Sequence, residues 1–170
     1  NVERALPFAI LGFDFDNGGE WLNWALIRYL QVRARPIRVT RSRPYHSDDN
    51  AHVEQKNWMW PRQLLGYGRL EAEALLPPIN TLYTEAWGPL QNFFLPSMKL
   101  VEKWREGSRW VRRHDAPQTA YQRLLAHGEL KAKARRELRD RYEALDPFVL
   151  AAEVERRLKP ILGAALAVGA

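Results

Sequence analysis

Apolar residues in the first part of the chain alternate between strand-like and helix-like spacing. Phe8 to Phe15 begins as an apolar run and then alternates with polar residues, which is typical of a strand leaving a core for an edge. An Asp-Asn-Gly-Gly turn follows, and Glu20 to Arg33 has the broad apolar face of a helix. Pro36 to Thr40 is predicted as a second strand, and Ala51 to Leu65 as a helix that Pro61 kinks or splits. This order of elements predicts an α/β class.

The later sequence predicts helices and one hairpin. Leu70 to Phe94 is helical in pattern, but we expect Pro77-Pro78 and Gly88-Pro89 to interrupt it. Lys99 to His114 contains two short runs on either side of a turn around Gly107, which indicates a β-hairpin. From Pro117 onward the chain is rich in Ala, Leu, Arg and Glu and is predicted to be helical, with breaks at Gly128 and Pro147.

Charge is concentrated in one C-terminal stretch. The chain carries 26 Lys and Arg against 20 Asp and Glu, a net charge of +6. Residues 99–143 hold 13 of these basic residues and 7 of the acidic ones, so the remainder is balanced at 13 of each. Such a stretch suits a polyanionic partner, and it equally describes a solvated helical surface.

Composition removes several classes of protein. Cysteine is absent, which excludes disulfides and thiolate metal sites. No apolar run follows a basic cluster near the start, so a signal peptide is not expected. The longest apolar stretch near the other end, residues 161–170, is too short to span a bilayer. We therefore expect no membrane partner.

Two acidic positions are candidates for chemistry. Asp16 follows the first predicted strand, and α/β folds place working residues beyond strand ends, although Asp-Asn-Gly is also an ordinary turn. Glu54 begins a predicted helix and shares one face with Asn57, Trp58 and Arg62, although a capped helix with a solvated side gives the same pattern. Each position taken alone has a structural explanation.

The ordered segments around these acids are more specific than either acid. The chain contains DFDNGGEWLN, TRSRPY and DNAHVEQKNW in that order. In this it resembles the DDE transposases of bacterial insertion sequences, which share the retroviral-integrase catalytic core. The resemblance covers residues 1 to about 126, and further matching segments lie at Arg62–Tyr67, Asn92–Phe94, Pro96–Leu100, Asp115–Thr119 and Gln122–Leu125.

The resemblance implies a partial RNase H-like fold, the integrase core, without its first strands. Two strands do not make a stable sheet alone, which agrees with strands lying upstream of this sequence. We expect residues 1–97 to form the C-terminal part of the catalytic core, 98–116 a basic hairpin, and 117–170 a helical tail.

The implied activity is DNA transposition or integration by metal-dependent phosphodiester cleavage and strand transfer. By resemblance, Asp16 is the second acid of the catalytic triad and Glu54 the third, and both are ligands of Mg²⁺ or Mn²⁺. Two divalent ions can activate the attacking oxygen and stabilise the leaving one. An upstream Asp that this chain does not contain would complete the two-metal site. We therefore expect these 170 residues alone to be inactive.

The expected partner is DNA, both the element ends and the target. By resemblance, Lys56 and Asn57 face the DNA end. Arg41 and Arg43 lie in a basic loop before the catalytic helix and would clamp phosphates, unless that loop is only solvated. In the hairpin the cations that would follow the backbone are Lys103, Arg105, Arg109, Arg112 and Arg113. The resemblance also implies a homo-oligomer acting in the bacterial cytoplasm, at the nucleoid.

Two other interpretations remain open. The chain fits a non-catalytic DNA-binding or assembly remnant of a transposase, in which the acids serve only the fold. It also fits an RNase H-like nuclease that only hydrolyses, although the matching segments beyond Glu54 argue against this. The prolines at 77, 78 and 89 depart from the family pattern, which natural variation and a decayed copy explain equally well.

Overall fold

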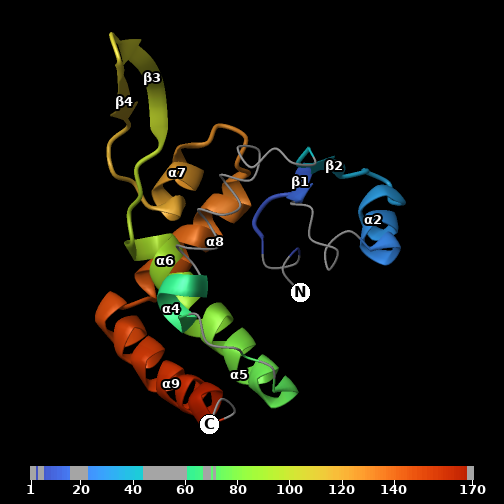
Figure 1. Ribbon diagram of the computed structural model, residues 1–170, viewed down its shortest axis with the longest axis vertical. Helices are drawn as coiled ribbons and strands as arrows, with labels where there is room; N and C mark the ends of the chain where they lie inside the picture. Colours follow the sequence, from blue (N-terminus) through green and yellow to red (C-terminus); the bar gives the residue numbers. More distant parts are fainter. Residues whose placement is uncertain are drawn as a thin grey trace. The chain divides into compact units, whose positions relative to one another are not determined.

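Four strands and a larger number of helices make up the described part of the chain (Figure 1). The computed structural model describes residues 3, 6–15, 23–43, 61–66, 70 and 72–167, the last three of these in their backbone only. The chain divides into two compact units, Asn1–Tyr67 and Gly68–Ala170. Each unit contains a two-stranded sheet, parallel in the first and antiparallel in the second. The predicted α/β class is confirmed.

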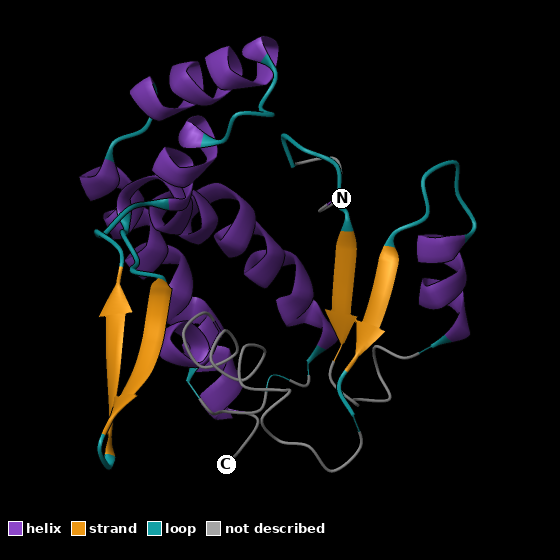
Figure 2. Cartoon of the chain, turned by 90° about the horizontal axis from the view of Figure 1, so that it is seen from above, coloured by secondary structure: helices purple, strands orange, loops and turns teal. Residues whose placement is uncertain are grey.

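The first unit contains a strand, a helix and a second strand that pairs in parallel with the first. β1 (Gly12–Phe15) lies beside β2 (Arg38–Arg41), with Gly12 opposite Arg38 and Phe15 opposite Arg41. Parallel strands need a crossover connection, which α2 (Trp24–Gln31) supplies. Figure 2 shows the two arrows pointing the same way, with α2 beside β2. The short α4 (Gln63–Leu65) ends at Gly66.

Buried side chains from β1, from α2 and from the residue just before β2 form one small core. Phe15, Leu30 and Ile37 are each at most 4% exposed. Four partly buried residues pack against them: Ile10, Phe13, Leu26 and Val39. The rings of Phe13 and Phe15 are stacked at 4.6 Å, because residues two positions apart on a strand point to the same face. This core holds α2 against the two strands.

The first helix begins later than the apolar pattern predicts. Asn23 has an extended backbone, and its side-chain oxygen accepts a 2.8 Å hydrogen bond from the N–H of Leu26. That geometry is an N-cap, so the helix starts at Trp24 and not at Glu20. Hydrophobic periodicity identified the element, and the cap determined its boundary.

In the second unit, residues 73–94 are helical without a break. The segment passes through η3 (Glu73–Leu75), α5 (Leu76–Thr81), η4 (Leu82–Trp87) and α6 (Gly88–Phe94). The expected interruptions at Pro77-Pro78 and Gly88-Pro89 were therefore wrong. Pro77 and Pro78 occupy the first turn of α5, where a missing N–H costs little.

Gly88 and Pro89 follow a π-helical turn, which explains how the helix continues through them. The N–H of Gly88 donates to the carbonyl of Tyr83, five residues earlier. A proline inside a regular α-helix clashes with the carbonyl four residues back, and a π-turn changes that register. A Cβ on Gly88 would lie 2.4 Å from the Tyr83 oxygen, so this turn requires glycine.

The long α9 (Pro147–Ala167) covers this helical segment and forms the core of the second unit with it. Leu82, Ala86 and Ile161 are at most 1% exposed. Leu90, Phe93, Leu150 and Val154 are also buried. At the edge of the contact Arg157 of α9 forms a 2.8 Å ion pair with Glu85 of η4. Within the described residues, no helix combines the length and hydropathy needed to cross a membrane.

The predicted hairpin and C-terminal helices are confirmed. β3 (Leu100–Glu106) pairs with β4 (Arg109–His114) through a two-residue turn in which Gly107 has a φ of +60°. Glycine adopts that value without the Cβ clash of other residues. α7 (Ala120–Ala126) and α8 (Ala132–Glu143) follow, separated around Gly128 as expected. In Figure 1 the hairpin projects from the helices of its own unit.

Gly88→Ala should destabilise the protein by roughly 1–3 kcal/mol, because the new methyl group meets the Tyr83 carbonyl inside a packed helix. Gly163→Ala in α9 is the matched control, since nothing lies within 4 Å of the added Cβ. That variant should be stabilised by up to about 1 kcal/mol through helix propensity alone. Urea unfolding of both variants measures the difference, and equal stability changes would contradict the close contact.

Candidate functional site

The two parallel strands end together, at the edge where an α/β fold places its working residues. Phe15 and Arg41, the last residues of β1 and β2, are opposite each other. Ser42, only 5% exposed, then bonds back to the Phe15 carbonyl through its N–H at 3.0 Å and its hydroxyl at 3.3 Å. Ser42 belongs to the TRSRPY segment, so this segment is fastened to the end of β1.

The residues predicted to hold metal lie outside the described part of the chain. Asp16 is the next residue in sequence after β1, and Glu54 follows the TRSRPY segment by nine positions. Lys56 and Asn57 also lie outside the described residues. Within the ranges that are described, no group of three or more His, Asp or Glu side chains could hold a metal ion. That finding does not extend to Asp16 and Glu54.

Asp14, the other acid of the DFDNGG segment, is hydrogen-bonded across the sheet. Thr40 lies opposite it on β2, and the Thr40 hydroxyl donates to the Asp14 carboxylate at 2.7 Å. This pair lies one residue before the strand ends. Arg41 and Arg43, the predicted phosphate-binding residues of the loop, are both exposed on either side of the buried Ser42.

The hairpin separates its cations onto two faces. Successive side chains of a strand point to opposite faces, and residues paired across an antiparallel ladder share a face. Lys103 is opposite Arg112, and Arg105 is opposite Trp110. These four residues therefore share one face, which we call the cationic face. The five predicted DNA-binding residues of the hairpin are thus divided, with Arg109 and Arg113 on the other side.

The opposite face is balanced in charge. Glu102 is paired with Arg113 through a 3.1 Å ion pair, and Glu106 is opposite Arg109. Trp104 on this face donates its indole N–H to Glu106 at 2.9 Å. The cationic face holds three basic side chains and no acid across its two paired positions, whereas the opposite face has one acid for each base.

A clasp at the base of the hairpin joins it to α7. Two nitrogens of Arg123 contact the Asp115 carboxylate at 2.5 and 3.2 Å, and the second also donates to the Ser97 carbonyl at 2.7 Å. Asp115 in turn accepts the N–H of Lys99 at 2.6 Å. These bonds, with the Ser97–Gln118 bridge, connect three chain segments: Pro96–Leu100, Asp115–Thr119 and Gln122–Leu125. We call this group of residues the clasp.

The clasp lowers the pKa of the Asp115 carboxyl group. Hydrogen bonds, mainly from Arg123 and secondarily from the Lys99 N–H, lower this pKa from its ordinary 3.8 to about 2. The adjoining helix is also well capped: Thr119 and Gln122 exchange hydrogen bonds in a capping box. The segments around Asp115 and Gln122 therefore have a structural role.

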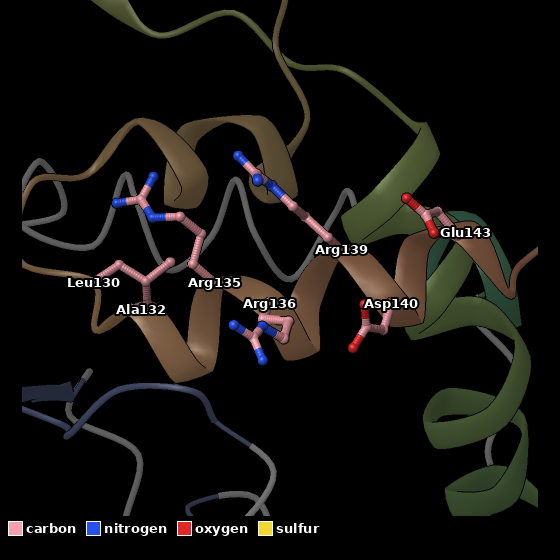
Figure 3. Close-up of a pocket in the computed structure, with 7 residues that line it drawn as sticks. All are labelled: Leu130, Ala132, Arg135, Arg136, Arg139, Asp140 and Glu143. Carbon is pink, nitrogen blue, oxygen red and sulfur yellow. The ribbon is translucent and has the colours of Figure 1, made fainter.

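A groove of about 390 Å³ lies along α8 and mixes both signs of charge. Figure 3 shows Arg135 and Arg139 leaving one side of the helix, with Arg136 and Asp140 leaving another. Arg135 is engaged with the carbonyls of Leu125 and His127 at the end of α7. Because Asp140 and Glu143 also line the groove, it does not form a concentrated anion site.

Sequence reasoning missed Trp110, Ser42 and the clasp. Counting outward from the Gly107-Ser108 turn would have paired position 105 with 110 and 103 with 112, so Trp110 was within reach. Ser42 gives no such signal, because nothing in TRSRPY indicates that the serine is buried against a strand end.

Replacing the clasp acid should change how stability depends on pH. A depressed pKa stabilises the folded state fully above the unfolded value near 3.8, and this contribution is lost as the pH falls toward 2. Asp115→Asn should therefore lower the thermal midpoint at pH 5 and approach the wild type by pH 2. Melting curves across this range measure it, with Glu102→Gln as a control because its ion pair is exposed. A wild-type advantage that stays constant down to pH 2 would contradict the assignment.

Comparison with known proteins identifies a relative without a described role. The uncharacterized protein y4rM of Sinorhizobium fredii is 41% identical over 120 residues, which cover 69% of this chain. The chain spans about a third of the length of that protein, at 33%. No protein-family model matches the chain. No solved structure matches it either.

Proposed function

We propose that this chain is part of the catalytic domain of a DDE-type transposase or integrase with an RNase H-like core. In this proposal Asp16 and Glu54 are metal-binding carboxylates, and a further Asp elsewhere in the full-length protein completes the site. The parent enzyme would cleave DNA at element ends and transfer the freed strand to target DNA. The parent enzyme would act in the bacterial cytoplasm, at the nucleoid. It would act as a homo-oligomer on paired DNA ends.

The observation that supports this most directly is the parallel pairing of β1 and β2. The strands end side by side, and Ser42 fastens the start of the TRSRPY segment to the last residue of β1. Asp16 is the next residue in the sequence. Open α/β sheets gather reactive groups beyond the carboxyl ends of their strands. A strand–helix–strand crossover followed by a fastened basic loop is therefore a reasonable support for an acid at this position.

The donor chemistry of the two acids fits a hard divalent ion. Mg²⁺ prefers carboxylate oxygens, keeps several waters, and is commonly bound through one or two carboxylates together with substrate phosphates. Bound there, such ions would supply Lewis-acid stabilisation of the charge that builds on a transferring phosphate. The protein's own task would be to hold the carboxylates in position, while Arg41, Arg43, Lys56 and Asn57 hold the DNA strand.

The basic residues of the described part supply a second reason to favour DNA. Arg41 and Arg43 lie at and just beyond the strand ends, and the cationic face of the hairpin is not balanced by acids. Contacts from such residues to phosphates give affinity without sequence selectivity. Recognition of a particular element end would then reside in another part of the full-length protein.

A non-catalytic DNA-binding or assembly remnant is the second candidate. The cationic face supports it equally well, because phosphate binding there needs neither Asp16 nor Glu54. The two candidates differ only in whether the acids are required for chemistry.

In the full-length parent, Asp16→Asn or Glu54→Gln should abolish strand transfer while DNA binding persists. We expect a loss of more than about 100-fold, because removing one group that stabilises transition-state charge already costs that much. The assay joins labelled element-end DNA to a plasmid target in Mg²⁺ or Mn²⁺. Asp14→Asn is the matched control, since it alters a neighbouring acid that keeps a partner in Thr40.

Each outcome of that assay decides between the candidates. Loss of transfer with DNA binding retained supports the enzyme, whereas unchanged transfer would remove both acids from the mechanism and leave the remnant. Hydrolysis of DNA without any joining would indicate a nuclease instead.

The 170-residue chain by itself should show no strand transfer, because two carboxylates leave the proposed site incomplete. Incubating the purified chain with element-end DNA and Mn²⁺ tests this expectation. Robust transfer by the isolated chain would show that no further Asp is needed.

A further inference from the structure

The cationic face of the hairpin carries an exposed tryptophan among its basic side chains. Trp110 is 51% exposed, which is unusual for a residue of this size. Arg105 lies directly opposite it on β3, and Arg112 lies two positions further along β4 on the same face. The ammonium of Lys103 is 4.4 Å from the centre of the indole ring. An aromatic ring thus shares one side of a two-stranded sheet with three cations, one of which contacts it.

Burial in a hydrophobic core does not explain the position of Trp110. The partner side chains that the structure gives to Trp110 are hydrophilic and cationic, so the ring is not part of a hydrophobic core. The other tryptophan of the hairpin, Trp104, is half-buried on the opposite face and donates its N–H to Glu106. Trp110 is therefore exposed among cations, whereas Trp104 is half-buried and hydrogen-bonded to an acid.

Both features of the cationic face match the two parts of a single DNA strand. Basic side chains follow the phosphate backbone, and an exposed aromatic ring stacks on bases. Stacking needs a base whose flat face is open, which a paired base inside a duplex does not offer. A duplex would contact the cations through its phosphates, but its paired bases would not stack on Trp110.

We propose that the cationic face binds an unpaired DNA strand, with Trp110 stacking on a base and Lys103, Arg105 and Arg112 contacting the flanking phosphates. The choice of DNA rests on the proposed function, since strand cleavage and transfer generate unpaired ends. The binding surface itself rests on the hairpin geometry. The balanced face, which carries Arg109 and Arg113, takes no part in this contact.

The clasp fixes the position of the cationic face relative to α7. Arg123 and Asp115 hold both ends of the hairpin at the start of α7, and the turn at Gly107 lies at the far end. A strand lying across the hairpin would therefore be held at a fixed distance from the helices of its own unit. Ordered cations and a supported ring lose less entropy on binding than mobile ones.

Fluorescence anisotropy with the purified 170-residue chain tests the proposal. The probes are a labelled 15-nucleotide oligo(dT), an oligo(U) of equal length, and a covalently closed DNA duplex without free ends. Trp110→Ala should weaken oligo(dT) binding by about 5- to 150-fold, the usual range for loss of one stacked base. The same variant should change duplex binding less than about twofold, and Trp110→Phe should restore most of the oligo(dT) affinity.

Matched double variants separate the two faces. Arg105→Gln with Arg112→Gln removes two charges from the cationic face, and Arg109→Gln with Arg113→Gln removes two from the balanced face. Only the first pair should weaken oligo(dT) binding strongly. It should also make the slope of log binding constant against log salt concentration shallower by about 1.4, because two single-strand phosphate contacts are lost. Thermal melting of each variant shows whether the hairpin still folds.

Several results would overturn the proposal. These are an unchanged oligo(dT) affinity for a folded Trp110→Ala, equal losses from the two double variants, tighter binding of oligo(U) than of oligo(dT), or Trp110-dependent binding to phosphatidylserine vesicles without binding to oligo(dT). None of them bears on Asp16 and Glu54. Conversely, transfer that survives substitution of both acids would remove the proposed enzyme function and leave a Trp110-dependent strand-binding surface intact.

Discussion

The contact between Arg123 and Asp115 is the interaction on which the attachment of the hairpin to the helices of its unit depends. One guanidinium binds a carboxylate with two nitrogens and also a backbone carbonyl at Ser97, while the same carboxylate accepts the N–H of Lys99. The clasp thus joins the chain entering the hairpin, the chain leaving it and the helix that follows. A two-stranded hairpin is marginal alone, so its attachment to a packed helix is what makes it a defined surface.

The hairpin illustrates how strand geometry converts a basic stretch into two different surfaces. Alternation places Lys103, Arg105 and Arg112 together with Trp110, and it places Arg109 and Arg113 beside glutamates. The total charge of the stretch is the same in either case. Its ability to bind a polyanion is not, because acids beside the cations cancel the local positive potential that attracts phosphate. The proposed strand-binding surface is therefore a consequence of register.

The fold class and the sites were predictable from the sequence to different extents. Periodicity identified the strand–helix–strand order of the first unit, because burial of one face leaves a regular apolar spacing. The turn around Gly107 indicated the hairpin, and composition indicated the C-terminal helices. Prediction failed at Pro77 and Pro89, where proline was expected to break the helix. A first-turn position and a π-turn accommodate them, and neither follows from propensity. The start of α2 was also misjudged, since the cap at Asn23 depends on a local backbone conformation.

The sequence by itself determined the α/β class, the concentration of positive charge in residues 99–143, and the ordered segments that single out Asp16 and Glu54. Each of these is a property of residue types and their spacing along the chain. Only the tertiary structure decided that β1 and β2 are parallel and joined through Ser42, and that Asp115 and Arg123 form a clasp. These facts depend on which distant residues meet. Strand pairing and side-chain hydrogen bonds bring these residues together, and the spacing of residues along the chain does not predict which partners they find.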